Sequence, residues 1–188
     1  MLIELEIHST ANTNSADERA VVVLKEKGGE RLLPVMMSMR RAMVVAMRSS
    51  LLVPLQLPVS IADVGCMLMS KFGVRIARIE LTAIKDGTFF CRVVAEREGE
   101  EQSVDFCQAP DGLVIAAVAH CPIMIEETLL DAQYMQKTGD HSFALNINVL
   151  TRSMLEEALK HAIENENYEA ASHLRDELAK RTKEKKPE

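Results

Sequence analysis

Residues 74–94, VRIARIELTAIKDGTFFCRVV, contain the pattern on which the expected fold depends. Apolar residues alternate in part with polar ones before Asp86-Gly87, and an aromatic and β-branched run follows it. An Asp-Gly pair between two such runs is a strong signal for a tight β-hairpin. We therefore expect two neighbouring antiparallel strands in the middle of the chain.

Strand-like segments lie on both sides of this hairpin. Val21–Glu26 is rich in β-branched residues, and Gly28-Gly29 permits a tight turn into Arg31–Met36. Leu2–Ile7 and Gln102–Phe106 are further strand candidates. Helical spacing is found at residues 38–47, 60–72, 113–119 and 126–136. Tight turns between neighbouring strands favour an α+β fold, a mainly antiparallel mixed sheet with inserted helices, over a doubly wound parallel sheet.

A helical hairpin is expected after the sheet domain. We predict a domain over residues 1–136, a linker or edge strand over 137–150, and two helices with a basic tail over 151–188. Ser153 and Glu156 are spaced as a capping box for the first helix, and Asn167 is placed to cap the second. The basic residues from Lys180 onward predict a solvated tail that frays.

Composition limits the function classes. The chain has 188 residues, a net charge of −6, no Trp and 4% aromatic residues. This argues against a protein that coats nucleic acid through positive charge, but it does not exclude a nuclease. The four cysteines form no C-x-x-C pair, and we expect neither a signal peptide nor a membrane helix. A cytoplasmic protein with reduced thiols is the simplest expectation.

The C-terminal residues 155–178, LEEALKHAIENENYEAASHLRDEL, closely resemble the UVR motif of excinuclease subunits B and C. In proteins with this motif the hairpin docks onto other proteins. The resemblance implies a protein partner for this chain, with Tyr168, Ala171, Arg175 and Asp176 as its binding residues. Physical reasoning agrees: a lone two-helix hairpin buries little apolar surface, so it needs the parent domain or another copy to be stable. A plain hairpin without a partner is the alternative.

Residues 1–135 resemble the bifunctional nuclease domain, a family associated with cleavage of both DNA and RNA. The resemblance rests on Arg31-Leu-Leu-Pro-Val35 before a helix, on Asp86-Gly-Thr-Phe-Phe90, on Val104-Asp105 before a helix that begins near Asp111, and on Cys121-Pro-Ile123. It implies metal-dependent hydrolysis of nucleic-acid phosphodiester bonds.

Three aspartates are the candidate catalytic and metal-binding residues: Asp63, Asp105 and Asp111. Hydrolysis assisted by Mg²⁺ or Mn²⁺ requires carboxylates that converge on the ion, and a cation that stabilises the phosphate charge. Helix caps at Asp63 and Asp111, and a turn at Asp105, are the structural alternatives. Either Ser60 or Asp63 is placed to begin its helix.

Several polar positions of the family pattern are changed in this chain. Ser38 and Arg41 stand where the family has Gly and Glu, and Asp63 keeps the Asp of a motif that has lost its Arg and His. A second hypothesis follows, in which a catalytically degenerate scaffold binds proteins through the hairpin. Exposed edge strands and the hairpin's own apolar face favour a homo-oligomer under either hypothesis.

Overall fold

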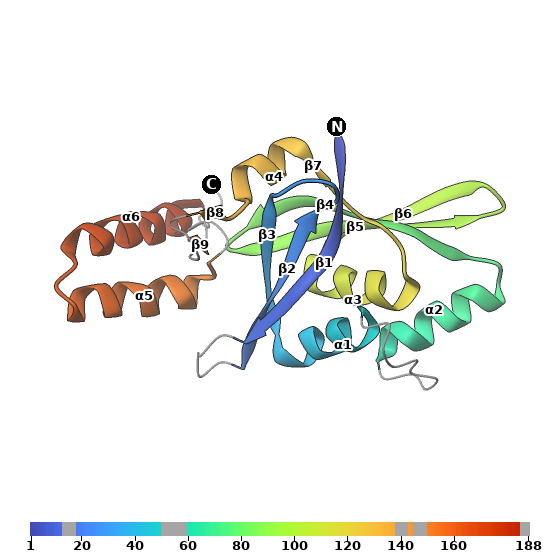
Figure 1. Ribbon diagram of the computed structural model, residues 1–188, viewed down its shortest axis with the longest axis horizontal. Helices are drawn as coiled ribbons and strands as arrows, with labels where there is room; N and C mark the ends of the chain where they lie inside the picture. The colour runs from blue at the N-terminus through green and yellow to red at the C-terminus, as the bar shows by residue number, and fades with distance from the viewer. Residues whose placement is uncertain (13–17, 50–59, 138–142, 145–149, 185–188) are drawn as a thin grey trace.

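The computed structural model describes residues 1–12, 18–49, 60–137, 143–144 and 150–184. The chain folds as an α+β protein around a mixed sheet of seven strands (Figure 1). The strands of this sheet are β1 (Leu2–Asn12), β2 (Arg19–Glu26), β3 (Leu32–Ser38), β4 (Arg75–Lys85), β5 (Thr88–Arg97), β6 (Glu100–Gln108) and β7 (Ile123–Glu126). The helices are α1 (Met39–Ser49), α2 (Ile61–Lys71), α3 (Ala109–Ala119), α4 (Glu127–Gln133), α5 (Arg152–Glu164) and α6 (Tyr168–Glu184).

The sheet has the order β3-β2-β1-β7-β4-β5-β6. Its pairs are antiparallel except for β4 and β7, which run parallel. The predicted hairpin at Asp86-Gly87 is confirmed as the β4–β5 connection, with φ angles of 50° and 73° at the two turn residues. The hairpin around Gly28-Gly29 is confirmed as β2–β3.

One face of the sheet is covered by helices, and the hydrophobic core lies between the two layers. Helix α1 packs on β1, β2 and β3, whereas α3 packs on β4 and β5. Helix α3 is buried on most sides because it lies between the sheet and the helices α1 and α2. A Cβ atom on Gly112 would lie 2.5 Å from the Cys91 sulfur, so this glycine allows the close approach of α3 to the sheet.

Helix boundaries confirm some sequence predictions and correct others. Ser60 is the N-cap of α2, so it begins that helix, and Asp63 is the third helical residue. Helix α3 begins at Ala109 with Gln108 as its N-cap, and the expectation that Asp111 caps it was wrong. Pro110 explains the difference, because proline fits the first turn of a helix, where its missing N–H costs nothing.

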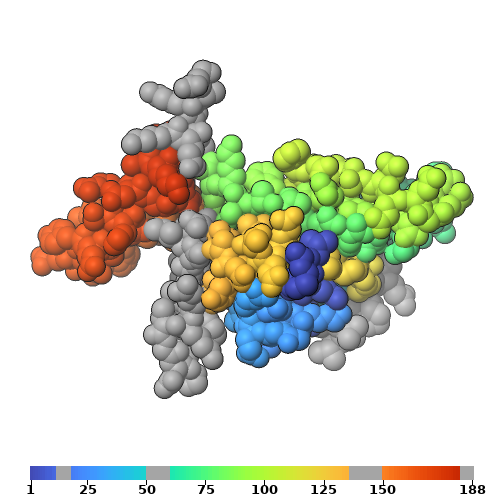
Figure 2. All heavy atoms as spheres, turned by 90° about the horizontal axis from the view of Figure 1, so that it is seen from above, coloured from blue at the N-terminus to red at the C-terminus, as the bar shows by residue number. Residues whose placement is uncertain are grey.

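Helices α5 and α6 lie side by side at one end of the molecule, and the β5–β6 hairpin lies at the other (Figures 1 and 2). The predicted capping box at Ser153 was wrong, because α5 begins at Arg152 with Thr151 as its N-cap. Asn167 caps α6 as predicted, since its Oδ1 atom accepts a hydrogen bond from the Ala170 amide at 3.2 Å. A short antiparallel pair of strands is formed by β8 (Gln136–Lys137), which crosses the predicted boundary between residues 136 and 137, and β9 (Phe143–Ala144), which lies in the predicted linker region 137–150.

Among the described residues, two contacts fasten the helix pair to the sheet domain, and a third joins α6 to the segment before α5. Arg19 donates to the Thr151 hydroxyl at 2.9 Å. Arg181 is 5% exposed and donates to the Leu150 carbonyl at 2.6 Å. The β4–β5 turn approaches so closely that a Cβ on Gly87 would lie 2.3 Å from the Leu150 oxygen. As far as Glu184 the expected fraying from Lys180 was wrong, because α6 continues to that residue and Arg181 is bound to Leu150. The rest of the expected tail lies outside the described residues.

Among the helices of the described residues, none combines the length and apolar character that spanning a membrane requires.

Candidate functional site

A groove of about 730 Å³ lies between α1, α2 and α3. Arg40 and Arg41 come from the first turn of α1, Ser60 from the start of α2, and Asp111 from the first turn of α3. Ser38 at the end of β3 also lines the groove, and the rest of the described wall consists of mostly apolar residues from the same three helices. The groove therefore has a polar end and a long apolar surface.

Asp63 is held in place at the start of α2 by a capping box and by an ion pair. One carboxylate oxygen accepts from the Ser60 amide at 2.8 Å and from the Ser60 hydroxyl at 2.7 Å, which completes a capping box. The other oxygen forms an ion pair with Arg48 near the end of α1. The Asp63 and Arg48 side chains are only 5% and 15% exposed. The structural alternative for Asp63, a role in helix capping, is confirmed.

Asp111 forms a bidentate ion pair with Arg41 at the polar end of the groove. The Nε–Oδ1 distance is 2.8 Å, and the Arg41 side chain also donates to Oδ2 at 3.1 Å. The two side chains are 40% and 51% exposed. Water therefore screens this pair, unlike the buried pair of Asp63 with Arg48.

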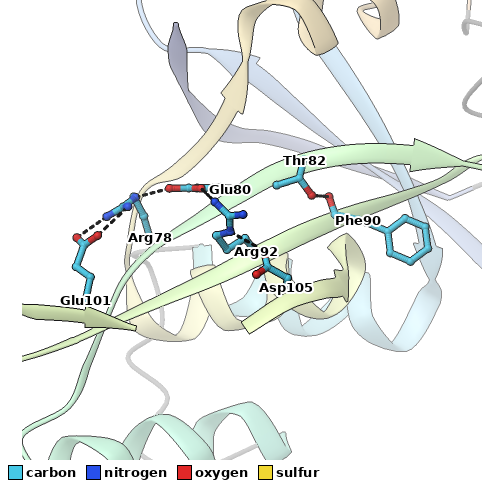
Figure 3. Close-up of polar contacts among 7 residues, drawn as sticks. All are labelled: Arg78, Glu80, Thr82, Phe90, Arg92, Glu101 and Asp105. Atoms are coloured by element: carbon cyan, nitrogen blue, oxygen red, sulfur yellow. Dashed lines mark hydrogen bonds and ion pairs between the residues drawn. The ribbon is translucent and has the colours of Figure 1, made fainter. Parts of the chain in front are cut away.

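Asp105 lies on the face of the sheet opposite to the helices (Figure 3). It belongs to strand β6, which confirms the strand predicted over Gln102–Phe106 and not the turn offered as the structural alternative. Its carboxylate accepts from Arg92 Nε at 2.5 Å. Arg92 also contacts Glu80, which lies between the core residues Ile79 and Leu81 and so points to the other face of β4.

A row of alternating charges crosses this open face of the sheet. Arg78 donates to Glu80 at 2.6 Å and to Glu101 through two hydrogen bonds of 2.5 and 2.9 Å (Figure 3). These bonds raise the pKa of Arg78 and lower the pKa of Glu101. Asp105 is thus one end of a cross-strand charge network, and sequence reasoning missed the buried Glu80 at its centre.

The three predicted site aspartates bind three different arginines. Asp63 and Asp111 both contact α1, but Asp105 lies beyond the sheet. Within the described parts of the chain, no group of three or more His, Cys, Asp or Glu residues is arranged to hold a metal ion. Because Mg²⁺ and Mn²⁺ sites depend on converging carboxylate oxygens, these residues as placed do not fit such an ion.

Two cysteines and a histidine among the described residues share a cavity but do not form an activated nucleophile. Cys66, His120 and Cys121 line a second cavity of about 370 Å³, which adjoins the groove because Cys66 and Met69 line both. Burial raises the pKa of Cys121 to about 11 and also raises that of Cys66, so both thiols stay protonated near pH 7. His120 is exposed and ends α3 in a left-handed conformation, with φ of 52°.

The predicted docking residues on α6 divide between its surface and its interior. Tyr168 is 68% exposed, and the side chains of Arg175 and Asp176 are 70% and 71% exposed. Ala171 is 8% exposed and lies inside the helix pair. An aromatic ring and two charged groups are therefore available to a partner along α6, whereas Ala171 shapes the pair itself.

Residues 22–138 match the family model described as the bifunctional nuclease domain. The matched region extends from β2 to β8 and contains the groove, the open sheet face and all three aspartates. Among curated proteins, none matches the chain significantly. Helices α5 and α6 lie outside the matched region.

Proposed function

The chain belongs to the bifunctional nuclease domain family, and from this premise we propose that it hydrolyses phosphodiester bonds in DNA and RNA. The observation that carries the proposal is the family match, which spans the whole sheet from β2 onward and its helix layer. The family match supports a nuclease-like domain. The proposal is that the domain of this chain is active and that its substrates are DNA and RNA.

The polar end of the groove supports contact with a phosphate. Arg40 and Arg41 lie together there, and guanidinium groups bind phosphate oxygens through paired hydrogen bonds. The pair between Arg41 and Asp111 is half exposed, and such surface pairs contribute about 0–1 kcal/mol. An entering phosphate can therefore compete for Arg41 at little cost. Opening this pair would also release the carboxylate of Asp111, which is the one of the three candidate aspartates that lines the groove.

We propose in addition that the α5–α6 pair is a UVR-like docking element. Its support is the sequence resemblance over residues 155–178, together with the exposed Tyr168, Arg175 and Asp176. The pair projects from the end of the sheet domain that lies opposite the β5–β6 hairpin (Figure 1). A protein bound there would leave the groove and the open sheet face accessible.

A second candidate function is favoured by the ion pairs of the site. Each of the three aspartates is neutralised by an arginine, and Asp63 is committed to a buried pair and a helix cap. A scaffold that has lost hydrolysis would retain such pairs because they stabilise the fold. In this function the domain serves to present α5 and α6 to a partner protein.

One experiment separates the two functions. Labelled single- and double-stranded DNA and RNA are incubated with the purified chain in Mg²⁺ or Mn²⁺, with and without EDTA. Asp111→Asn and Asp105→Asn are compared with Arg97→Gln, a surface control on the β5–β6 hairpin. Hydrolysis at the groove predicts that Asp111→Asn abolishes cutting and that the Asp105 and Arg97 variants retain it. Absence of cutting by the folded wild type would refute the nuclease proposal and leave the scaffold.

A further inference from the structure

The apolar part of the groove has a size and shape that phosphate contact does not require. Its wall is built from all three helices and contains Val44, Ile61, Ala62, Met69, Val114 and Ile115. The volume of the whole groove, about 730 Å³, falls within the range of small-molecule sites, which are mostly apolar with a few polar groups.

Gly65 indicates that this space is kept open. It lies in the middle of α2, where glycine is among the least favourable residues for a helix. Gly112 in α3 has a packing reason, because Cys91 would collide with a side chain there. Gly65 has none among the described residues: a Cβ added to it meets no described atom within 4 Å. Since Gly65 lines the groove, a side chain there would occupy the groove itself.

The polar end carries a net positive charge. Arg40 and Arg41 are its two cations, and Asp111 is the one acidic residue among the described lining residues. Asp111 is already paired with Arg41, and Arg40 has no ion pair among the described residues.

We propose that this groove binds a small amphipathic anion, with its carboxylate or phosphate head at Arg40 and its apolar body along α2 and α3 beside Gly65. The proposal does not rest on nucleic-acid hydrolysis, because a molecule of this kind contains no bond for a nuclease to cut. Carboxylate and phosphate heads share the charge and the acceptor oxygens that a guanidinium recognises.

Titration calorimetry with the full chain tests the proposal. The probes are decanoate and decyl phosphate, below their micelle concentrations, with decanol as the uncharged comparison. We expect both anions to bind with one site per chain and decanol to bind at least about ten-fold more weakly. The anion that binds more tightly identifies the head group that the site prefers. Absence of binding by both anions to the folded chain would overturn the proposal.

Two variants place the ligand. Gly65→Leu fills the groove, so we expect at least a ten-fold loss of affinity for both anions, while the midpoint of thermal unfolding rises by about 2–4 °C because the helix is improved. Val64→Leu, at the neighbouring position of α2 outside the groove lining, should leave binding unchanged. Arg40→Gln should weaken the anions by about three-fold and leave decanol unaffected, because it removes one exposed charge. Equal binding by Gly65→Leu and the wild type would refute the assignment to this groove.

Discussion

The Asp63–Arg48 pair allows the sharpest separation of structural and catalytic roles. The change is Asp63→Asn, which removes the charge and keeps the size of the side chain. Removing one partner of a buried ion pair costs about 3–5 kcal/mol, because the remaining charge loses its counter-ion. Exposures of 5% and 15% place this pair in that class. We therefore expect the free energy of unfolding to fall by about 3–4 kcal/mol, since the asparagine retains part of the cap.

Urea unfolding at pH 7, followed by circular dichroism, measures this loss. Asp111→Asn is the matched control, because its pair with Arg41 is half exposed and should cost no more than about 1 kcal/mol. Arg48→Gln should destabilise the fold as much as Asp63→Asn, and the double variant should cost less than the sum of the two. A stability of Asp63→Asn within about 1 kcal/mol of the wild type would refute the structural role. If such a variant also lost cutting, Asp63 would be assigned to the chemistry.

Two further substitutions and one labelling experiment test other parts of the fold. Gly87→Ala should loosen the helix pair, because φ is 73° and the new Cβ would lie 2.3 Å from the Leu150 oxygen. Limited trypsin digestion should therefore release α5–α6 faster than in Gly99→Ala. In that control φ is also positive, but the new Cβ meets no described atom within 4 Å. Arg31 lowers the pKa of Glu26, so this pair stabilises the fold above the unfolded pKa of about 4.3 and loses its effect as pH falls through the lower folded value. Arg31→Met should therefore flatten the decline of unfolding free energy between about pH 5 and pH 3, and an unchanged slope would contradict this. Burial raises the pKa of Cys91 to about 12, so iodoacetamide at pH 8 should label it, by peptide mass spectrometry, only after unfolding.

Much of the sheet was predictable because its signals are local. Asp86-Gly87 and Gly28-Gly29 specify their hairpins through backbone conformations that few other residue pairs adopt. The start of α3 was misplaced because Asp111 is a favoured capping residue, whereas the N-cap is Gln108, three residues earlier, and Pro110 lies in the first turn. Local propensity alone could not rank these two signals.

The site was less predictable because it depends on pairing between distant segments. Each candidate aspartate has its arginine 13 to 70 residues away along the chain. Glu80 was missed for the same reason: its burial between Arg78 and Arg92 is visible only once β4 and β5 are aligned. Arg181 resembles the rest of a basic tail in sequence, and only the approach of Leu150 distinguishes it. A backbone carbonyl is present in every residue, so the sequence does not show which arginine will bind one.

Strand β6 also limits the pairing of a strand from another molecule at this edge of the sheet. It is an edge strand with acidic residues at positions 100, 101 and 105, and a bulge interrupts its pairing at Phe106, where φ is 59°. A strand added from outside would bury those charges and meet a backbone twisted away from it. Growth of cross-β fibrils from this edge is therefore disfavoured, and the exposed hairpin can extend into solvent without becoming a template for aggregation.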